Sequence, residues 1–322
     1  TTTDISGNFK KLLDLGSFNL TYTKSGYIST TQSATIETDN QTVVVSTVTL
    51  LDSSSCTAGT VAGTISDAVS GNAVSDISLS VRSGLNVTSG STTGTTAATA
   101  NNGTYTLSSM NAGGYTVQAS KDEYITSFFN VNVCGNISNQ NTNISESLNS
   151  ESLRIVVHWA ADSGVVVLDS HITGPDNTSG RFHIYWNAST ALTRHQDPDN
   201  FFYHTNAYQC NSCSTTQASD NVSLDRDDLD GAPGTETITV TEVRSGTYRY
   251  SVHDYTNRDN SSSTKLAQSG TTVNVFYNNT QTTYNVPNSA GNLWVVFTFN
   301  GSTGVLTASD NMTAETNTNN IQ

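Results

Sequence analysis

The segment GSFNLTYTKSGYI (residues 16–28) returns later in the chain as GGYTVQASKDEYI (residues 113–125). The landmarks before each copy also match, since Gly7-Asn8-Phe9 aligns with Gly103-Thr104-Tyr105. Within both copies apolar and polar residues alternate, which is the period of a half-buried β-strand. The repeat therefore predicts two copies of one antiparallel β unit, and no helical i, i+3, i+4 pattern persists in either copy.

The second copy is longer than the first and opens with TVAGTISDAVSGNAVSDISLSV (residues 60–81), which predicts two strands and a turn. Together with the shared segment, this stretch resembles the carboxypeptidase regulatory-like domain, a small prealbumin-like β-sandwich. Glu123 departs from that pattern, because the family usually has glycine before the tyrosine of this turn. We expect a complete sandwich over residues 52–148 and, over residues 1–51, an incomplete one that lacks its opening strands.

A polar segment (NQNTNISESLNSES, residues 139–152) is predicted to be a linker to a third region of short strands and turns. The strands are expected in LRIVVHW, LDSHITGP, GRFHIYW, LDRDDLDGAPGTETITV, GTYRYSVHDY and LWVVFTF. This set resembles the YfaP-like secreted-protein domain. The chain departs from that family's pattern through an extra Ala232-Pro233-Gly234 and an insertion from Ala188 to Gln217. The predicted fold is all-β, with three consecutive sandwiches: residues 1–51, 52–148 and 149–307, followed by a polar tail over residues 308–322.

The composition is polar with few charges: 12% of residues are charged, and the formal net charge is −14. Such acidity disfavours nucleic acid and anionic lipid as partners. No apolar run approaches the roughly 18 residues of a membrane span, and no signal peptide is present, so mature or trimmed extracellular material is expected.

Four cysteines in a chain of this composition favour two disulfides. Three connectivities exist. Cys56 with Cys134 is favoured because both fall in one repeat unit, and Cys210 with Cys213 because they are neighbours in one loop. A redox pair or half of a zinc site is the alternative for the second pair, but neither a βαβ pattern nor a second ligand pair accompanies it.

An acidic loop is the densest candidate for chemistry. Carboxylate oxygens on a loop that contains glycine suit Ca²⁺, although the spacing rejects an EF-hand. The alternative is a solvated acidic turn. The predicted ligands, with one from the LDSH segment, are Asp169, Asp225, Asp227, Asp228, Asp230 and Glu236.

His171, His183 and His253 each fall on an expected strand of the third region. Three imidazoles suit a transition metal if they converge, whereas histidines on strands more often hydrogen-bond within a sandwich. The chain has no G-x-S-x-G elbow, H-E-x-x-H, P-loop or G-x-G-x-x-G, so no enzymatic activity is predicted.

Thirteen N-x-S/T sequons occur, a number close to what the Asn, Ser and Thr content gives by chance. Asn19 should point to solvent between inward-facing neighbours, and Asn102 lies in a predicted turn. The sequons are Asn19, Asn40, Asn86, Asn102, Asn136, Asn143, Asn177, Asn187, Asn221, Asn260, Asn278, Asn300 and Asn311.

The incomplete first sandwich suggests function. If residue 1 is the true start, the missing strands leave an apolar groove and an unpaired edge, which a strand from another subunit would fill. The predicted function is therefore a structural subunit of an extracellular, glycosylated filament or surface assembly, with the tail from Val305 as a candidate donor strand. The alternative is a secreted, calcium-dependent carbohydrate-binding or adhesin module, with Phe201, Phe202, Tyr203 and Tyr208 stacking on sugars.

Overall fold

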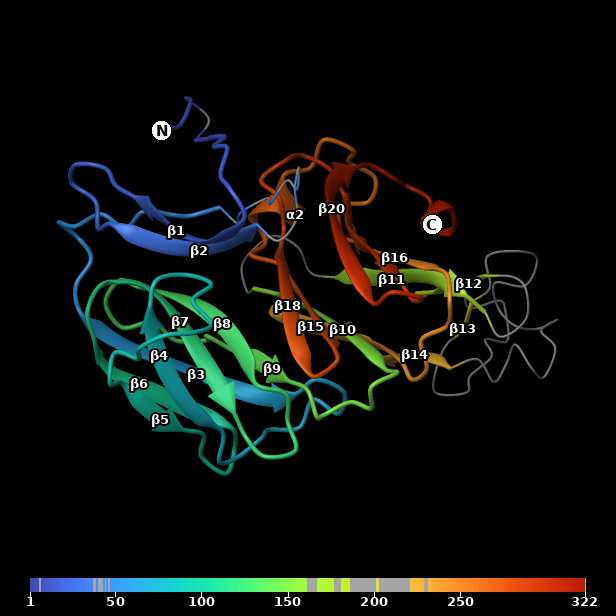
Figure 1. Ribbon diagram of the computed structural model, residues 1–322, viewed down its shortest axis with the longest axis horizontal. Helices are drawn as coiled ribbons and strands as arrows, with labels where there is room; N and C mark the ends of the chain where they lie inside the picture. The colour runs from blue at the N-terminus through green and yellow to red at the C-terminus, as the bar shows by residue number, and fades with distance from the viewer. Residues whose placement is uncertain are drawn as a thin grey trace.

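The computed structural model of the chain describes residues 1–5, 7–36, 39, 43, 45, 47–160, 167–176, 181–185, 201–202, 221–228 and 231–321. Strands dominate these residues, and the only helices among them are α2 (Lys265–Gln268) and the 3₁₀ turn η1 (Thr318–Asn320). The all-β prediction is confirmed. Figure 1 shows three groups of strands along the chain, which we call the hairpin, the small sandwich and the large sandwich. No helix in the described residues is long and apolar enough to cross a membrane.

The hairpin consists of β1 (Gly16–Tyr22) and β2 (Thr30–Ile36), paired antiparallel. Two backbone hydrogen bonds join β2 to the small sandwich. One runs from the Leu85 amide to the Thr31 carbonyl (2.7 Å) and the other from the Ser33 amide to the Leu85 carbonyl (3.0 Å). The hairpin is drawn in blue in Figure 1, next to β7 and β8.

The small sandwich packs two sheets around one core. One sheet has the order β6-β3-β9 and the other β5-β4-β7-β8. Alternate side chains of these strands, such as Val61, Leu79, Leu107 and Val117, are buried between the sheets. The strands are β3 (Gly59–Asp67), β4 (Ser78–Ser83), β5 (Thr96–Ala98), β6 (Thr104–Met110), β7 (Gly113–Ser120), β8 (Ser127–Val133) and β9 (Thr142–Ile144).

The hairpin repeats part of the small sandwich in detail. The strands β1 and β2 occupy the positions of β7 and β8 in the sequence repeat, and the same turn joins each pair. In that turn Gly26 has φ +81° and Glu123, its counterpart, has φ +71°, which is a left-handed conformation that favours glycine. The Ile28 amide donates to the Leu51 carbonyl as the Ile125 amide does to Ser145, both at 2.8 Å. The sequence repeat is therefore a structural one.

The predicted strand around Phe9 does not form. Its counterpart, β6, pairs with β3, and no strand of the described residues takes the place of β3 beside the residues around Phe9. Without that partner, the alternating pattern has no ladder to join. The Phe9 ring instead packs edge-on against Tyr22, with ring centroids 5.8 Å apart.

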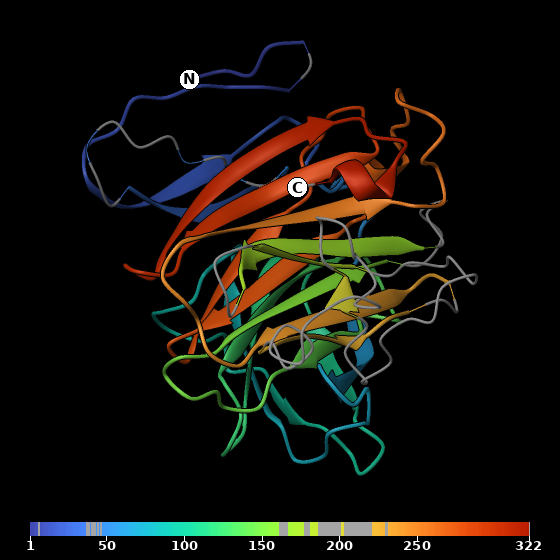
Figure 2. The ribbon, with the colours of Figure 1, turned by 90° about the vertical axis from the view of Figure 1, so that its right-hand side faces the viewer.

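The large sandwich packs a five-stranded sheet, β14-β15-β10-β17-β18, against a six-stranded sheet, β13-β12-β11-β16-β19-β20. Its core contains Trp159, Trp294 and Phe297, all fully buried. In Figure 2 the strands of this sandwich face the viewer, with η1 in front. The strands are β10 (Leu153–Trp159), β11 (Leu168–Pro175), β12 (Arg181–Ile184), β13 (Phe201–Phe202), β14 (Val222–Arg226), β15 (Gly234–Val240), β16 (Thr247–Asp254), β17 (Thr272–Tyr277), β18 (Thr280–Asn285), β19 (Leu293–Asn300) and β20 (Val305–Thr313).

The segment predicted as a polar tail, residues 308–322, is not one. Its first part belongs to β20, which pairs with β19 from Asn300↔Val305 to Leu293↔Thr313. Near its end Ile321 is 2% exposed. The segment from Val305 is therefore already used within its own sandwich, and the prediction that it is a donor strand for a neighbour is wrong.

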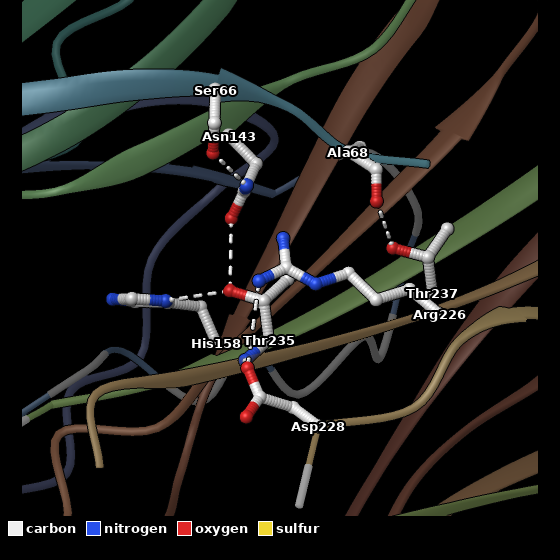
Figure 3. Close-up of polar contacts among 8 residues, drawn as sticks. All are labelled: Ser66, Ala68, Asn143, His158, Arg226, Asp228, Thr235 and Thr237. Atoms are coloured by element: carbon white, nitrogen blue, oxygen red, sulfur yellow. Dashed lines mark hydrogen bonds and ion pairs between the residues drawn. The ribbon is translucent and has the colours of Figure 1, made fainter. Parts of the chain in front are cut away.

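The predicted linker, residues 139–152, also carries structure. Within it β9 pairs in parallel with β3, from Ile65↔Thr142 to Asp67↔Ile144. The same segment contacts the large sandwich, because Thr235 Oγ1 donates to Asn143 Oδ1 (3.1 Å) while Asn143 Nδ2 donates to Ser66 Oγ (2.8 Å). Figure 3 shows this chain of contacts across the two sandwiches.

The contact between the two sandwiches is extensive and partly apolar. Ala68 and Ile125 of the small sandwich pack against Val156 and Phe276 of the large one. Alternation explains the arrangement, since on β10 and β15 one set of side chains enters the core of the large sandwich and the other faces the small sandwich. Thr237 follows this rule and donates to the Ala68 carbonyl at 2.5 Å (Figure 3).

Candidate functional site

The predicted calcium ligands do not all come together. A β-bulge between Leu224 and Arg226 re-aims the end of β14. Asp225 there accepts hydrogen bonds from the hydroxyls of Ser223 and Thr239. Burial raises the pKa of Asp225, while these two hydrogen bonds and the charge of Arg154 lower it in part.

Asp228 has partners of its own. It accepts the Thr235 amide at 3.0 Å and forms an ion pair with Arg226 at 3.5 Å (Figure 3). Asp230 lies outside the described residues. Of the six predicted ligands, the structure thus places these three elsewhere or does not describe them.

The other three predicted ligands, Asp169, Asp227 and Glu236, lie close together. Asp169 and Glu236 are both 0% exposed, and Glu236 Oε2 accepts the amide of Ser170, the residue next to Asp169, at 2.6 Å. Burial raises the pKa of both carboxyls well above the usual range, and the charge of Asp227 raises both further. Each carboxylate would cost much free energy if it were charged in this place without a cation.

Histidines surround Asp169 on its own sheet. Asp169 and His171 are two residues apart on β11, so their side chains point to the same face, and Asp169 pairs directly with His253 of β16. Ligand atoms of Asp169, His171 and His253 all lie within 4.8 Å of one another, and all three residues are buried. The prediction that these histidines lie on strands is confirmed, and Asp169 lies close both to them and to two of the predicted acidic residues, Asp227 and Glu236.

Hydrogen bonds orient the two imidazoles. His253 Nε2 lies 2.9 Å from the Glu315 carbonyl oxygen, which can only accept, so this nitrogen carries the proton. His171 Nδ1 lies 2.9 Å from His183 Nε2, and Tyr185 stacks on both rings, with centroids 4.8 and 4.5 Å away. Burial lowers the pKa of His171 well below its usual value and also lowers that of His253, so both imidazoles are neutral at pH 7.

The Asp169 pairing with histidine was visible in the sequence as a short signal. In LDSH the acid and the histidine are spaced i, i+2, and in SVHD the histidine lies on another strand. What the sequence did not contain was the register that places His253 opposite Asp169. That register joins strands that are far apart in the sequence, and no local pattern encodes it.

A second feature is the open edge of β1. In the small sandwich β7 pairs with β8 on one side and with β4 on the other. Its counterpart β1 pairs with β2, and no strand of the described residues lies at its other edge. On the same hairpin Phe18, Leu20 and Tyr22 are only half-buried, whereas Val117 and Ala119, the counterparts of the last two, are 0% and 1% exposed.

A groove with a volume of about 1180 Å³ lies elsewhere, among β2, β8, β18 and β20. Asn, Thr and Ser side chains line much of it. The titratable side chains among its described lining residues are His158, Tyr277, Tyr284 and Asp310. The acid and histidine cluster is not part of this groove.

The structure separates the predicted glycosylation sites by exposure. Asn19 and Asn102 are exposed, as predicted, and Asn102 lies in a turn. Asn143 is only 7% exposed and both ends of its amide are hydrogen-bonded within the interface, so the prediction of a glycan there is corrected. Asn86 and Asn221 are half-buried. The other exposed sites are Asn136, Asn260, Asn278, Asn300 and Asn311, while Asn40, Asn177 and Asn187 lie outside the described residues.

The predicted disulfide between Cys56 and Cys134 is confirmed, with a sequence separation of 78. Cys56 precedes β3 and Cys134 follows β8, so the bond joins the two sheets of the small sandwich. The predicted Cys210–Cys213 bond lies outside the described residues, as do Tyr203 and Tyr208.

No family model matches this chain, and no curated protein matches it. The two family resemblances therefore stay predictions.

Among solved structures, the chain is similar to a streptococcal ancillary pilin, with 11% identity over 74% of this chain and 66% of the other, and a TM-score of 0.24. It is also similar to the full-length major pilin SpaD of Corynebacterium diphtheriae, with 10% identity over 74% and 65% and a TM-score of 0.25. A third similar structure is that of BcpA, the major pilin subunit of Bacillus cereus, with 10% identity over 78% of this chain and 92% of the other, and a TM-score of 0.23. At these scores the similarities carry no argument about function, which must come from the geometry of the chain itself.

Proposed function

We propose that the protein is a structural subunit of an extracellular assembly, joined to its neighbours by strand complementation at β1. The observation that carries the proposal is the position beside β1 that no strand of the described residues occupies and that β4 fills beside the equivalent strand β7. An unpaired strand edge with an apolar face is a template for another strand. The disulfide of the small sandwich fits an oxidising, extracellular setting.

The energetics require more than a single strand. An inserted strand buries about four side chains at roughly 1.5 to 3 kcal/mol each, or about 6 to 12 kcal/mol in all. Association costs an estimated 4 to 15 kcal/mol, so one strand gives a marginal interface. Leu12 and Leu15, which are 87% and 54% exposed beside β1, supply further apolar surface for a partner. We infer that the donated strand and these side chains are covered together.

A second copy of this chain is the proposed partner. A head-to-tail contact of this kind does not close on itself, and it generates a filament. The exposed sequons lie on the hairpin and on both sandwiches, so a glycan coat would surround such a filament and keep its largely uncharged surface soluble. The donor strand is not the segment from Val305, which β19 already holds.

The experiment uses two matched charge substitutions on β1. Leu20→Lys places a charge on the half-buried apolar face, and Thr21→Lys places the same charge on the exposed face one residue later. We expect Leu20→Lys to reduce self-association at least tenfold, while Thr21→Lys changes it little. Sedimentation velocity over a range of concentrations and negative-stain electron microscopy measure the effect.

Two results would count against the proposal. One is wild-type protein that stays monomeric at every concentration, because a free edge would then have no partner among its own copies. The other is equal assembly of both variants, which would place the contact away from β1. Tryptophan fluorescence reports whether each variant is folded, because all three tryptophans lie between residues 153 and 313, outside the hairpin.

A further inference from the structure

The buried acid and histidine cluster contains ligand atoms that have no hydrogen-bond partner. Both carboxylate oxygens of Asp169, His171 Nε2 and His253 Nδ1 are buried and have no hydrogen-bond partner. Asp169 is 0% exposed, His171 1% and His253 0%. Buried polar atoms in folded proteins are almost always paired, so four such atoms in one place need a common explanation.

We propose that Asp169, His171 and His253 form a binding site for a divalent first-row transition-metal ion. One cation among the three side chains would satisfy all the unpaired atoms at once. Two imidazole nitrogens and one carboxylate are donors that Zn²⁺ and its neighbours accept, whereas Ca²⁺ takes oxygen ligands. The site thus differs in chemistry from the calcium loop predicted from the sequence, although it shares Asp169 with it.

The hydrogen bonds around the cluster fit this assignment. Because His253 Nε2 donates to the Glu315 carbonyl, Nδ1, which is buried and has no hydrogen-bond partner, keeps a free lone pair. When His171 Nδ1 donates to His183 Nε2, His171 Nε2 also has a free lone pair. Backing of this kind on the distal nitrogen is the usual outer shell of a histidine ligand.

The geometry requires only a small closure. Two ligands that are each about 2.0 to 2.2 Å from an ion lie roughly 3 to 4 Å apart. The ligand atoms here lie within 4.8 Å of one another, on two adjacent strands whose pairing fixes their backbones. Side-chain rotations therefore suffice to bind the ion. The ion would hold β11 to β16 and, through the Glu315 carbonyl, fix the C-terminal segment to the sheet.

The test titrates Zn²⁺ into the full chain after EDTA treatment and dialysis, with calorimetry for the affinity and metal analysis for the stoichiometry. We expect one Zn²⁺ per chain and, at 100 times the dissociation constant, a rise in the melting temperature of the chain of about 4 °C. Co²⁺ gives an independent readout, because its visible absorption reports nitrogen and oxygen ligands directly.

Two variants and a control locate the ion. Asp169→Asn and His253→Gln should each weaken Zn²⁺ binding at least tenfold, while His158→Gln, on β10 and outside the cluster, should leave it unchanged. Asp169→Asn removes a buried carboxyl without changing its shape, so the metal-free variant should melt no lower than the wild type. That combination separates a lost ligand from a misfolded chain.

Three outcomes would overturn the proposal. The wild type could bind neither Zn²⁺ nor Co²⁺ stoichiometrically, or both ligand variants could bind Zn²⁺ with the affinity of the wild type. The third outcome is that Ca²⁺ displaces Zn²⁺ from the site when the two ions are at equal concentration. The first would mean that Asp169 is satisfied by its proton alone. The last would restore the calcium interpretation.

Discussion

His158 shows how a single side chain is set by the sheet that bears it. It lies on β10, with Nδ1 3.1 Å from Thr235 Oγ1, and Arg226 and Asp228 are the charged groups near it (Figure 3). Burial lowers its pKa to about 4, and Arg226 lowers it slightly further, while the Gly234 backbone and Asp228 act in the other direction. The ring is therefore neutral in the folded chain at neutral pH.

This pKa predicts a loss of stability in acid. An unfolded histidine titrates near pH 6.5, so between pH 6.5 and about 4 the unfolded chain binds a proton that the folded chain does not. Stability is complete above that window and falls as the pH falls through it. Since the ring is partly exposed, we expect a loss of about 1 to 2 kcal/mol between pH 7 and pH 5.

Urea unfolding followed by tryptophan fluorescence at both pH values measures this loss. Other buried acids titrate as well, so the relevant quantity is the difference between the wild type and His158→Gln. The variant should lose less stability between the two pH values, by about 1 to 2 kcal/mol. An identical loss in both proteins would show that His158 is not the group responsible.

At the scale of the element, the sequence pattern predicted strands that bury side chains on one face. It missed strands whose side chains are mostly exposed on both faces. The alternating patterns of β1, β7 and β10 gave their positions from the sequence. The strand β20 was missed because most of its side chains are exposed and its main-chain pairing with β19 leaves no hydropathic pattern. The short β9 was missed for a related reason, since its three residues form a parallel pair with a distant strand.

The disulfide between Cys56 and Cys134 carries the prediction at this scale. It closes a loop with a sequence separation of 78 and joins the two sheets of the small sandwich. Chain entropy assigns such a bond about 4 kcal/mol. Replacing both cysteines by serine should lower the free energy of unfolding of the chain by about that amount.

Scanning calorimetry and urea unfolding of the whole chain measure this loss. The matched control replaces Cys210 and Cys213 by serine. Their predicted bond would close a very short loop, so its loss should cost less. Equal melting of the Cys56/Cys134 double variant and the wild type would contradict the entropic argument.

At the scale of the whole molecule, the sequence did not predict that the two sandwiches share an interface. Much of that interface is made of hydroxyl and amide groups, such as Gln281, which pairs with the Phe128 amide and carbonyl at 2.9 and 3.1 Å. In a chain so rich in Ser, Thr and Asn, these residues look the same as solvent-exposed ones. The buried cluster was hidden for the same kind of reason, because its ligands come together only once β11 and β16 are in register.

The interface predicts that the two sandwiches unfold together. Phe276 is 1% exposed and packs with Ala68, Ile125 and Val156 across the boundary. Phe276→Ala should cost about 3 to 5 kcal/mol, and most of that loss should fall on the contact between the sandwiches. Scanning calorimetry should then show two resolved transitions where the wild type shows one. Phe299→Ala, in the core of the large sandwich, removes a similar side chain and should lower the single transition without splitting it. If both variants split the transition, or neither does, the sandwiches are not coupled through Phe276, and each is stable on its own core.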